Sequence, residues 1–435
     1  MMGCMIPTVW RGPRLGLFFL STGLSCAVAL AQVNYSVHFE MEKPQYLLGE
    51  PIFCRFVIQN TGNMVFAFRY RTPARALASD SDQEPRFRVT DGQGRGLPDP
   101  GPRPCGSPMG SAVYGSVTLS SGQVHTERWL VNQWARFRVA GRYPLRAERR
   151  LALFQPGPSG GGLGEHPVAF ALALDELTVR VDPSTSEQVE AAFEPYLAAV
   201  QDRTNPNPAE AVVVLTSLPQ PFFFGQLVEM AYAGKPDRWD RRDALDGLAR
   251  LGTPASWAAI LNLFRSPDTI VGSESKGAVP GPEYPLWSYA LLLLAEKGDP
   301  AFVPAFIETL GQSAEPARGD ILRALGFFHD PHTYQVLFEN LHSAQVTDRM
   351  NAVLALKNLG TREVIPALLA ALNDPEVQVR QVASFALEGL TGRKVAVSSD
   401  TSREESLRAA NDWHAWWRQH AATFSPPRPT PCHDW

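Results

Sequence analysis

Two clusters in the sequence carry residue types that could bind an ion or a phosphate group. Asp80, Asp82 and Glu84 have the alternating spacing of oxygen ligands for Ca²⁺, but the sixth-position glycine and closing glutamate of the familiar calcium loop are absent. The glycines of TDGQGRG (90–96) mimic a phosphate-binding loop, yet the lysine and the helix that such a loop needs do not follow. We interpret the first cluster as a solvated loop and the second as a flexible hairpin.

The histidines and cysteines do not form a defined metal site in the sequence. Cys432, His433 and Asp434 are adjacent residues in a proline-rich tail, which gives no fixed coordination geometry. His414 and His420 are six residues apart and therefore do not share one face of a helix. No HExxH sequence and no nucleophile motif is present. We expect a protein without metal, cofactor or catalytic activity.

Residues 1–31 are predicted to be a secretory signal peptide. Arg11 and Arg14 precede an apolar run at 15–30, and small residues in the sequence ALA end that run. The alternatives are an uncleaved membrane anchor and a lipoprotein site at Cys26. The run is short and interrupted by polar residues, which favours cleavage. We therefore expect an exported protein, located in the periplasm, outside the cell or on the cell surface.

Removal of this leader would leave three cysteines. Cys54 and Cys105 are the candidate disulfide pair, because an exported compartment permits the bond. The alternative is that both are buried or free thiols, and the sequence does not separate the two cases. No later stretch approaches the roughly 20 apolar residues of a spanning helix, so no transmembrane segment is expected after cleavage.

The charge is unevenly distributed along the chain. Residues 32–183 carry 17 Lys and Arg against 14 Asp and Glu, whereas residues 184–435 carry 21 against 30. Neither part has the basic excess that binding to a phosphate backbone exploits. We therefore exclude nucleic acid as a partner.

Residues 34–183 alternate polar and apolar side chains with the period of two that is typical of strands. The sequences GEP and NTGN, then TLSSGQ and RVAGRYPLRA, mark turns between these strands. This region resembles a bacterial immunoglobulin-like module, which implies an antiparallel β-sandwich. Such modules are also similar to some small proteinase-inhibitor domains, as a likeness of fold alone.

Beyond residue 183 the pattern changes to the helical period, and one helix recurs. The segments RGDILRALGFF, DRMNAVLALKNLG and QVRQVASFALEGL follow one another at intervals of 31 residues, each paired with a companion helix. Neither helix of a pair can bury its apolar stripe alone, so the pairs must stack around a continuous core. Residues 240–393 resemble the short HEAT-like repeats of bilin-lyase-type proteins, and 184–239 resemble them weakly. We see no acidic or cysteine site for a bilin and expect no lyase activity.

Three features of this predicted solenoid could serve structure or binding. Each copy of the recurring helix carries an arginine near its start, which we expect to bond neighbouring loops as a structural ladder. These residues are Arg241, Arg318, Arg349 and Arg380. A loop and helix at 394–421 carry Trp413, Trp416 and Trp417, which we expect to cap the last repeat, and 422–435 is a predicted disordered tail. An insertion of 15 residues could carry a partner site or be a tolerated loop. Its candidate contact residues are Asp268, Glu274, Lys276, Glu283 and Tyr284.

These observations predict a multidomain protein, an all-β sandwich followed by an all-α solenoid. Repeats, an insertion and no recognisable chemistry favour a non-catalytic interaction scaffold that binds a protein or peptide through the solenoid surface. The alternative function is a proteinase-inhibitor-like or carbohydrate-binding sandwich, with the solenoid as its spacer.

Overall fold

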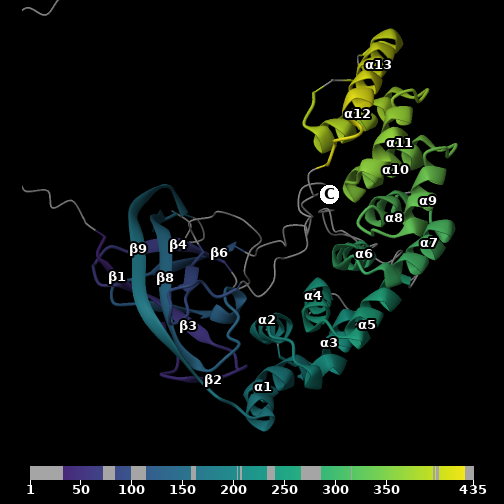
Figure 1. Cartoon of the computed structure of the whole chain (residues 1–435). Helices are drawn as coiled ribbons and strands as arrows, with labels where there is room; N and C mark the ends of the chain where they lie inside the picture. Colours follow the sequence, from purple (N-terminus) through teal and green to yellow (C-terminus); the bar gives the residue numbers. More distant parts are fainter. Residues whose placement is uncertain are drawn as a thin grey trace, which may run out of the picture.

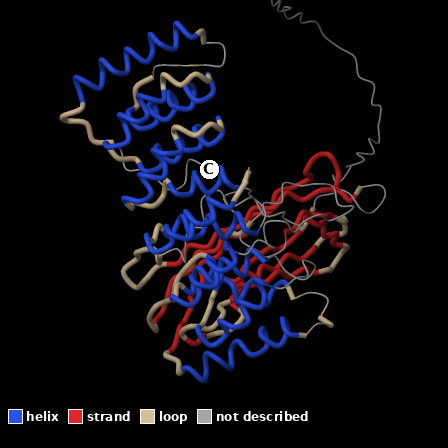
Figure 2. The backbone as a smooth tube through the Cα atoms, turned by 90° about the vertical axis from the view of Figure 1, so that its right-hand side faces the viewer, coloured by secondary structure: helices blue, strands red, loops and turns tan. Residues whose placement is uncertain are grey.

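The computed structural model contains a β-rich N-terminal region and a helical C-terminal region (Figures 1 and 2). It describes residues 33–426 except 72–83, 99–113, 158–162, 203, 206–207, 233–240, 266–285, 315, 395–396 and 398–400. We call 33–182 the sheet region and 186–421 the helical array. The predicted signal peptide lies outside the described residues. No helix in the described part of the chain combines the length and apolar character that a bilayer crossing requires.

Two sheets make up the sheet region. The first has the order β1 (Tyr35–Met41), β3 (Phe53–Asn60), β7 (Val124–Leu130). The second has the order β2 (Tyr46–Leu47), β9 (Leu163–Asp182), β8 (Gly141–Pro156), β4 (Phe66–Arg71), β6 (Tyr114–Leu119), and β5 (Arg86–Val89) also pairs with β8. β2 runs parallel to β9 and the other paired strands run antiparallel.

Inward-facing side chains of both sheets form one apolar core. An ion pair crosses this core, because the guanidinium of Arg149 on β8 donates to Glu127 on β7 at 2.7 Å. The same guanidinium lies 4.4 Å from the ring centroid of Phe56. Burial alone would raise the pKa of Glu127, but hydrogen bonds from His125 and Arg149 outweigh it and the net pKa is lowered. The pair therefore ties the two sheets together.

The helical array consists of helices that stack in two layers. The inner layer contains α2 (Ala209–Ser217), α4 (Arg241–Leu251), α6 (Leu286–Lys297), α8 (Ala317–Leu325), α10 (Val346–Leu359) and α12 (Val377–Thr391). The other helices are α1 (Ser186–Gln201), α3 (Phe224–Tyr232), α5 (Pro254–Arg265), α7 (Val303–Gln312), α9 (Pro331–Asn340), α11 (Ile365–Ala371) and α13 (Arg403–His420). Figure 1 shows α4, α6 and α12 on the side of the array nearer the sheets, and α5, α7 and α9 on the far side.

Local sequence explains where individual helices begin and end. Thr185 and Gln188 form a capping box at the start of α1, and Ser402 and Glu405 form another at the start of α13. α10 and α12 end at glycines with left-handed backbone angles, as expected for helix C-termini. The apolar stripes between these ends share one core along the array.

The sheet region packs against the first helices of the array. Phe53 and Leu130, at one end of the first sheet, belong to the buried core of the helical array. Arg128 on β7 pairs with Glu42 at 2.7 Å and with Glu210 on α2, so its guanidinium bridges the two regions. Its position 4.1 Å from the ring centroid of Phe53 adds a cation–π contact. This mixed apolar and ionic junction sets the position of the sheets at one end of the array.

Candidate functional site

The inner layer of helices presents a concave face toward the sheet region. The inner helices bury side chains against each other and against the outer layer of helices. The side chains of the inner helices that stay accessible therefore line the concave face. Successive inner helices place equivalent residues there at intervals of 31. These are Arg323, Leu354 and Phe385, whereas Leu292, at the equivalent position one repeat earlier, is buried. The repeat period therefore converts one sequence position into one row of side chains across the concave face.

Phe385 is the most exposed apolar side chain of this row. It is 55% exposed, and among the described residues it is the one large hydrophobic side chain of the inner helices that reaches this level. The ammonium of Lys357 on the preceding inner helix lies 4.6 Å from its ring centroid. On the adjacent helix α10, Leu354 and Met350 are partly buried. An exposed aromatic ring with adjacent apolar and cationic groups is typical of an anchor point for a partner.

A polar cluster lies nearer the sheets, on α4 and α6. The hydroxyl of Tyr289 donates to Asp246 at 2.5 Å, and the guanidinium of Arg250 lies 3.8 Å from the same carboxylate. Glu296 is an exposed residue at the surface of this cluster. Desolvation of its carboxyl group and the charge of Asp246 nevertheless raise the pKa of Glu296 to about 7. The described residues contain no group of three or more His, Cys, Asp or Glu side chains placed to hold a metal ion.

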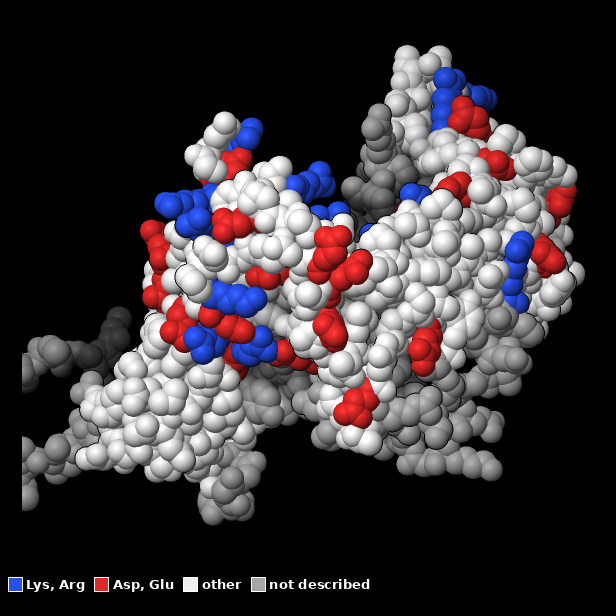
Figure 3. Space-filling model, turned by 90° about the horizontal axis from the view of Figure 1, so that it is seen from below, with Lys and Arg blue, Asp and Glu red and all other residues white. Residues whose placement is uncertain are grey.

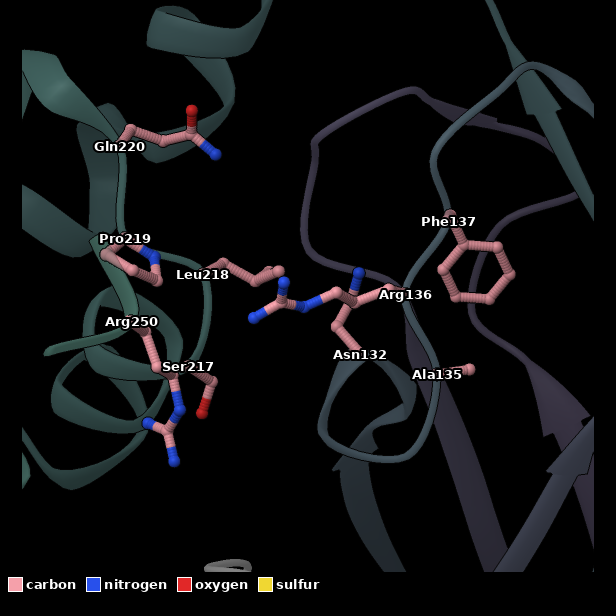
Figure 4. Close-up of a pocket in the computed structure, with 9 residues that line it drawn as sticks. All are labelled: Asn132, Ala135, Arg136, Phe137, Ser217, Leu218, Pro219, Gln220 and Arg250. Carbon is pink, nitrogen blue, oxygen red and sulfur yellow. The ribbon is translucent and has the colours of Figure 1, made fainter. Parts of the chain in front are cut away.

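A cleft of about 230 Å³ separates the sheet region from the array beside this cluster (Figure 4). It is lined by Asn132, Ala135, Arg136, Phe137, Ser217, Leu218, Pro219, Gln220 and Arg250. Figure 4 shows Arg136 reaching from the sheet side toward Leu218, with Arg250 beside Ser217 on the helical side. Arg250 is held by a 2.9 Å bond to the carbonyl of Thr216. Two guanidinium groups from opposite walls suit an acidic group in this cleft.

The four arginines near the start of recurring helices bond to residues of adjacent helices or loops. Arg318 donates to the carboxylate of Asp348 at 3.0 Å, and Arg349 donates to Asp374 at 2.8 Å. The side-chain bond to Asp374 raises the pKa of Arg349. Arg380 donates to the backbone carbonyls of Asp374 and Pro375, each at 2.9 Å.

The Nε of Arg241 donates a hydrogen bond to the backbone carbonyl of Ala231 at 2.7 Å. Carboxylates accept these bonds at Arg318 and Arg349 and carbonyls accept them at Arg241 and Arg380, and the role of a structural ladder stays a prediction. The guanidinium groups are therefore engaged within the array.

The tryptophans of the last helix lie at the end of the array. Trp413 is fully buried in the helical core, and the guanidinium of Arg393 lies 5.4 Å from its ring centroid. Trp416 and Trp417 are partly buried and pack against Phe424. Trp416 and Trp417 keep partly exposed rings, and the capping of the last repeat by these residues stays a prediction.

Several other sequence candidates fall outside the described residues or have a local structural role. Cys54 is a free thiol with no exposed surface, and burial raises its pKa to about 12. Cys54 therefore carries no disulfide, and the structure does not form the predicted Cys54–Cys105 pair; Cys105 itself lies outside the described residues. The same applies to the insertion 268–285 and to Asp80 and Asp82.

The glycine-rich stretch 90–96 forms a hairpin turn. Thr90 bridges Gly96, Gly94 has a positive φ of 77°, and Asp91 accepts bonds from the backbone of Gln93 and Arg95. Aspartate and glycine are the residues that such a turn requires. This geometry agrees with the interpretation of the stretch as a hairpin.

Sequence reasoning missed the cleft and the concave row of side chains. The cleft joins Asn132 and Arg250, which come from different regions and carry no common motif. The row was detectable, because its members are spaced by the 31-residue repeat, but the sequence does not show which repeat position faces the concave side.

Comparison with known proteins supports the helical repeat. A PBS lyase HEAT-like repeat matches residues 348–374, which span α10 and α11, so the predicted repeat type is confirmed there. No curated protein sequence matches the chain.

Three solved structures show distant likenesses to the chain. The complex of CpcE and CpcF of phycocyanin lyase from Nostoc sp. PCC7120 is 17% identical with a TM-score of 0.26, over 52% of this chain and 82% of that one. A computationally designed armadillo repeat protein for modular peptide recognition is 14% identical with a TM-score of 0.25, over 47% and 94%. Escherichia coli alpha-2-macroglobulin activated by porcine elastase is 13% identical with a TM-score of 0.18, over 87% and 37%. These likenesses carry no argument about activity. The chain therefore contains a β-rich region and a helical array with a PBS lyase HEAT-like repeat.

Proposed function

We propose that this protein is a non-catalytic interaction scaffold that binds a protein or peptide partner on the concave face of its helical array. The observation that carries the proposal is the exposed ring of Phe385, which stands on that face beside Lys357, with the partly buried Leu354 on the adjacent helix. Interface anchors are typically aromatic side chains with apolar neighbours. The partly exposed side chains of the neighbouring repeats extend this surface along the array.

The chemistry of the surface indicates the kind of segment that would fit. Arg323 on α8 is engaged by Asp320, while Asn351 and Gln381 offer amide groups on the following inner helices. Amides donate to and accept from a peptide backbone, and Phe385 offers an apolar contact. An extended segment with an apolar side chain at the α12 end matches this arrangement. An acidic group would be accommodated by the arginines of the cleft at the other end.

The scaffold is proposed to act outside the cytosol, after removal of residues 1–31. The sheet region is proposed to be an immunoglobulin-like sandwich. The arrangement of two sheets supports a sandwich. One sheet contains β1, β3 and β7, and it faces a second sheet in which the short strand β2 pairs in parallel with β9. In this arrangement the sheet region holds the array at one end and leaves the concave face accessible.

Selection from a random peptide library tests the proposal. Peptides selected on the chain from Gln32 onward should lose at least about tenfold in affinity for Phe385→Ala, as expected for an interface anchor. Leu407→Ala is the matched control, because Leu407 is 43% exposed on α13, away from the inner layer. Peptides whose binding is unchanged by Phe385→Ala and Leu354→Ala would contradict the assignment of the concave face.

A further inference from the structure

The outer face of the six-stranded sheet carries a stripe of large apolar side chains on β9. Their exposed fractions are 43% for Val168, 67% for Phe170, 50% for Leu172 and 48% for Leu174. The alanines at 171 and 173 point inward and are buried. The strand thus turns its small side chains to the core and its large ones to solvent. At about 3.3 Å per residue, the stripe is roughly 20 Å long.

Arginines occupy the other half of the same face. Six exposed arginines stand on the neighbouring strands β4, β5 and β8, and they are Arg69, Arg86, Arg88, Arg142, Arg146 and Arg150. The register places Arg150 directly opposite Leu172, so the basic half adjoins the stripe. Two glutamates share this part of the face, Glu148 opposite Leu174 and Glu176 opposite Arg146. The face is therefore apolar on one side and net positive on the other.

Exposed apolar patches of this kind mark interaction surfaces in soluble proteins. Figure 3 shows side chains of both signs mixed over the sheet region in one view. Continuous pairing of β8 with β9 from Gly141 to Leu153 makes the surface an even sheet. A bilayer with anionic lipids offers an even surface with negative headgroups above an apolar interior. Arginine side chains can keep their charge at headgroup level while apolar neighbours enter the interface.

We propose that this sheet face docks on the surface of an anionic lipid bilayer. Phe170, Leu172 and Leu174 enter the interface, and the arginines of β5 and β8 contact the anionic headgroups. The docking is peripheral and independent of the partner on the concave face. It would place the helical array at the membrane surface with its concave face accessible.

Flotation with lipid vesicles tests this proposal. The chain from Gln32 onward is mixed with vesicles of phosphatidylcholine containing 30 mol% phosphatidylglycerol, or of phosphatidylcholine alone, at about 0.1 M salt. The expected result is recovery with the anionic vesicles, weakened several-fold at 0.5 M salt by screening. Phe170→Ser with Leu172→Ser should lower the partition coefficient at least about tenfold, through loss of buried apolar area.

Charge reversal tests the basic half of the face. Arg146→Glu with Arg150→Glu should lower partitioning by at least about tenfold, since each cation near an anionic surface contributes about a fivefold factor. The controls are Val124→Ser, at a position 53% exposed on β7 of the other sheet, and Arg408→Glu on α13. Both should bind like the unchanged chain.

Three outcomes would overturn the proposal. They are no recovery with anionic vesicles, equal recovery with both vesicle types, and losses no larger in the face variants than in the controls. A dimer in analytical ultracentrifugation that dissociates on Phe170→Ser with Leu172→Ser, without vesicle binding, would assign the face to a second copy instead. Circular dichroism of each variant establishes that the fold is retained. Because peptide binding is measured separately on Phe385→Ala, failure here leaves the concave-face proposal untouched.

Discussion

Replacing Gly326 by alanine should destabilise the helical array, although alanine is normally the better residue for a helix. Gly326 follows α8 with φ −64° and ψ −10°, a conformation that alanine adopts without strain. The backbone therefore gives no reason for glycine. A Cβ at this position would lie 2.3 Å from the carbonyl oxygen of Ala355 and 2.7 Å from its Cα. Glycine is required because α8 and α10 approach backbone to backbone.

The expected magnitude follows from these distances. Favourable contacts between heavy atoms lie at about 3.5–4.0 Å, so α8 and α10 must separate by roughly 1 Å to admit the methyl group. The neighbour is backbone and cannot rotate away. Overpacking of this kind costs about 1–3 kcal/mol, and the shared core on both sides of the contact places Gly326→Ala toward the upper end.

Gly311→Ala is the matched control, because a Cβ there meets nothing within 4 Å and Gly311 lies within α7. The substitution should stabilise the array by about 0.4–1 kcal/mol through the entropy of the unfolded chain. Urea unfolding monitored by circular dichroism should move the two midpoints in opposite directions. A Gly326→Ala chain as stable as the unchanged protein would refute the close approach of α8 to α10.

Three further predictions test single interactions. Arg349→Met should lower the free energy of unfolding by about 3 kcal/mol, because it leaves the largely buried carboxylate of Asp374 without its ion-pair partner. Arg380→Met removes only bonds to backbone carbonyls, so it should lower the free energy of unfolding by less in the same urea titration. The pKa of Glu296 in the folded protein is about 7, above the usual value of about 4.3. The folded state therefore holds the proton of Glu296 more tightly than the unfolded state does. The contribution of this group to the free energy of unfolding falls as the pH rises from about 4 to 7. Glu296→Gln should therefore flatten this part of the plot of unfolding free energy against pH. Cys54 has no exposed surface, so maleimide should label it in urea but not in buffer. Peptide mass mapping measures this labelling, and rapid labelling of the folded chain would contradict the burial of Cys54.

The 31-residue period predicted the helical array because helix formation and stacking are local. Each pair can bury its stripe only against the next pair, so the repeated Ala and Leu positions identify the core directly. The same register aligned Arg318, Arg349 and Arg380 before any contact was known. Turn chemistry in the sheet region was local in the same sense, as at Gly94, where the positive φ suits glycine.

The two faces of β9 could not be assigned from sequence. The run AFALAL is apolar at every position, so the period of two distinguishes no inner face. In the structure Ala173 is paired with Arg149 of β8, whose guanidinium fills the core beside Phe56. Small inward residues leave room for that buried side chain, and the large ones are turned to solvent.

The order of the two regions, the repeat and its arginines could be predicted from the sequence, since each depends on periodicity along the chain. The exposure of Phe385 and the meeting of Asn132 with Arg250 at one cleft depend on the three-dimensional packing. That packing also decided that β9 exposes its large side chains. These features depend on how distant segments share one core, and packing between segments far apart in sequence leaves no periodic signal in either of them.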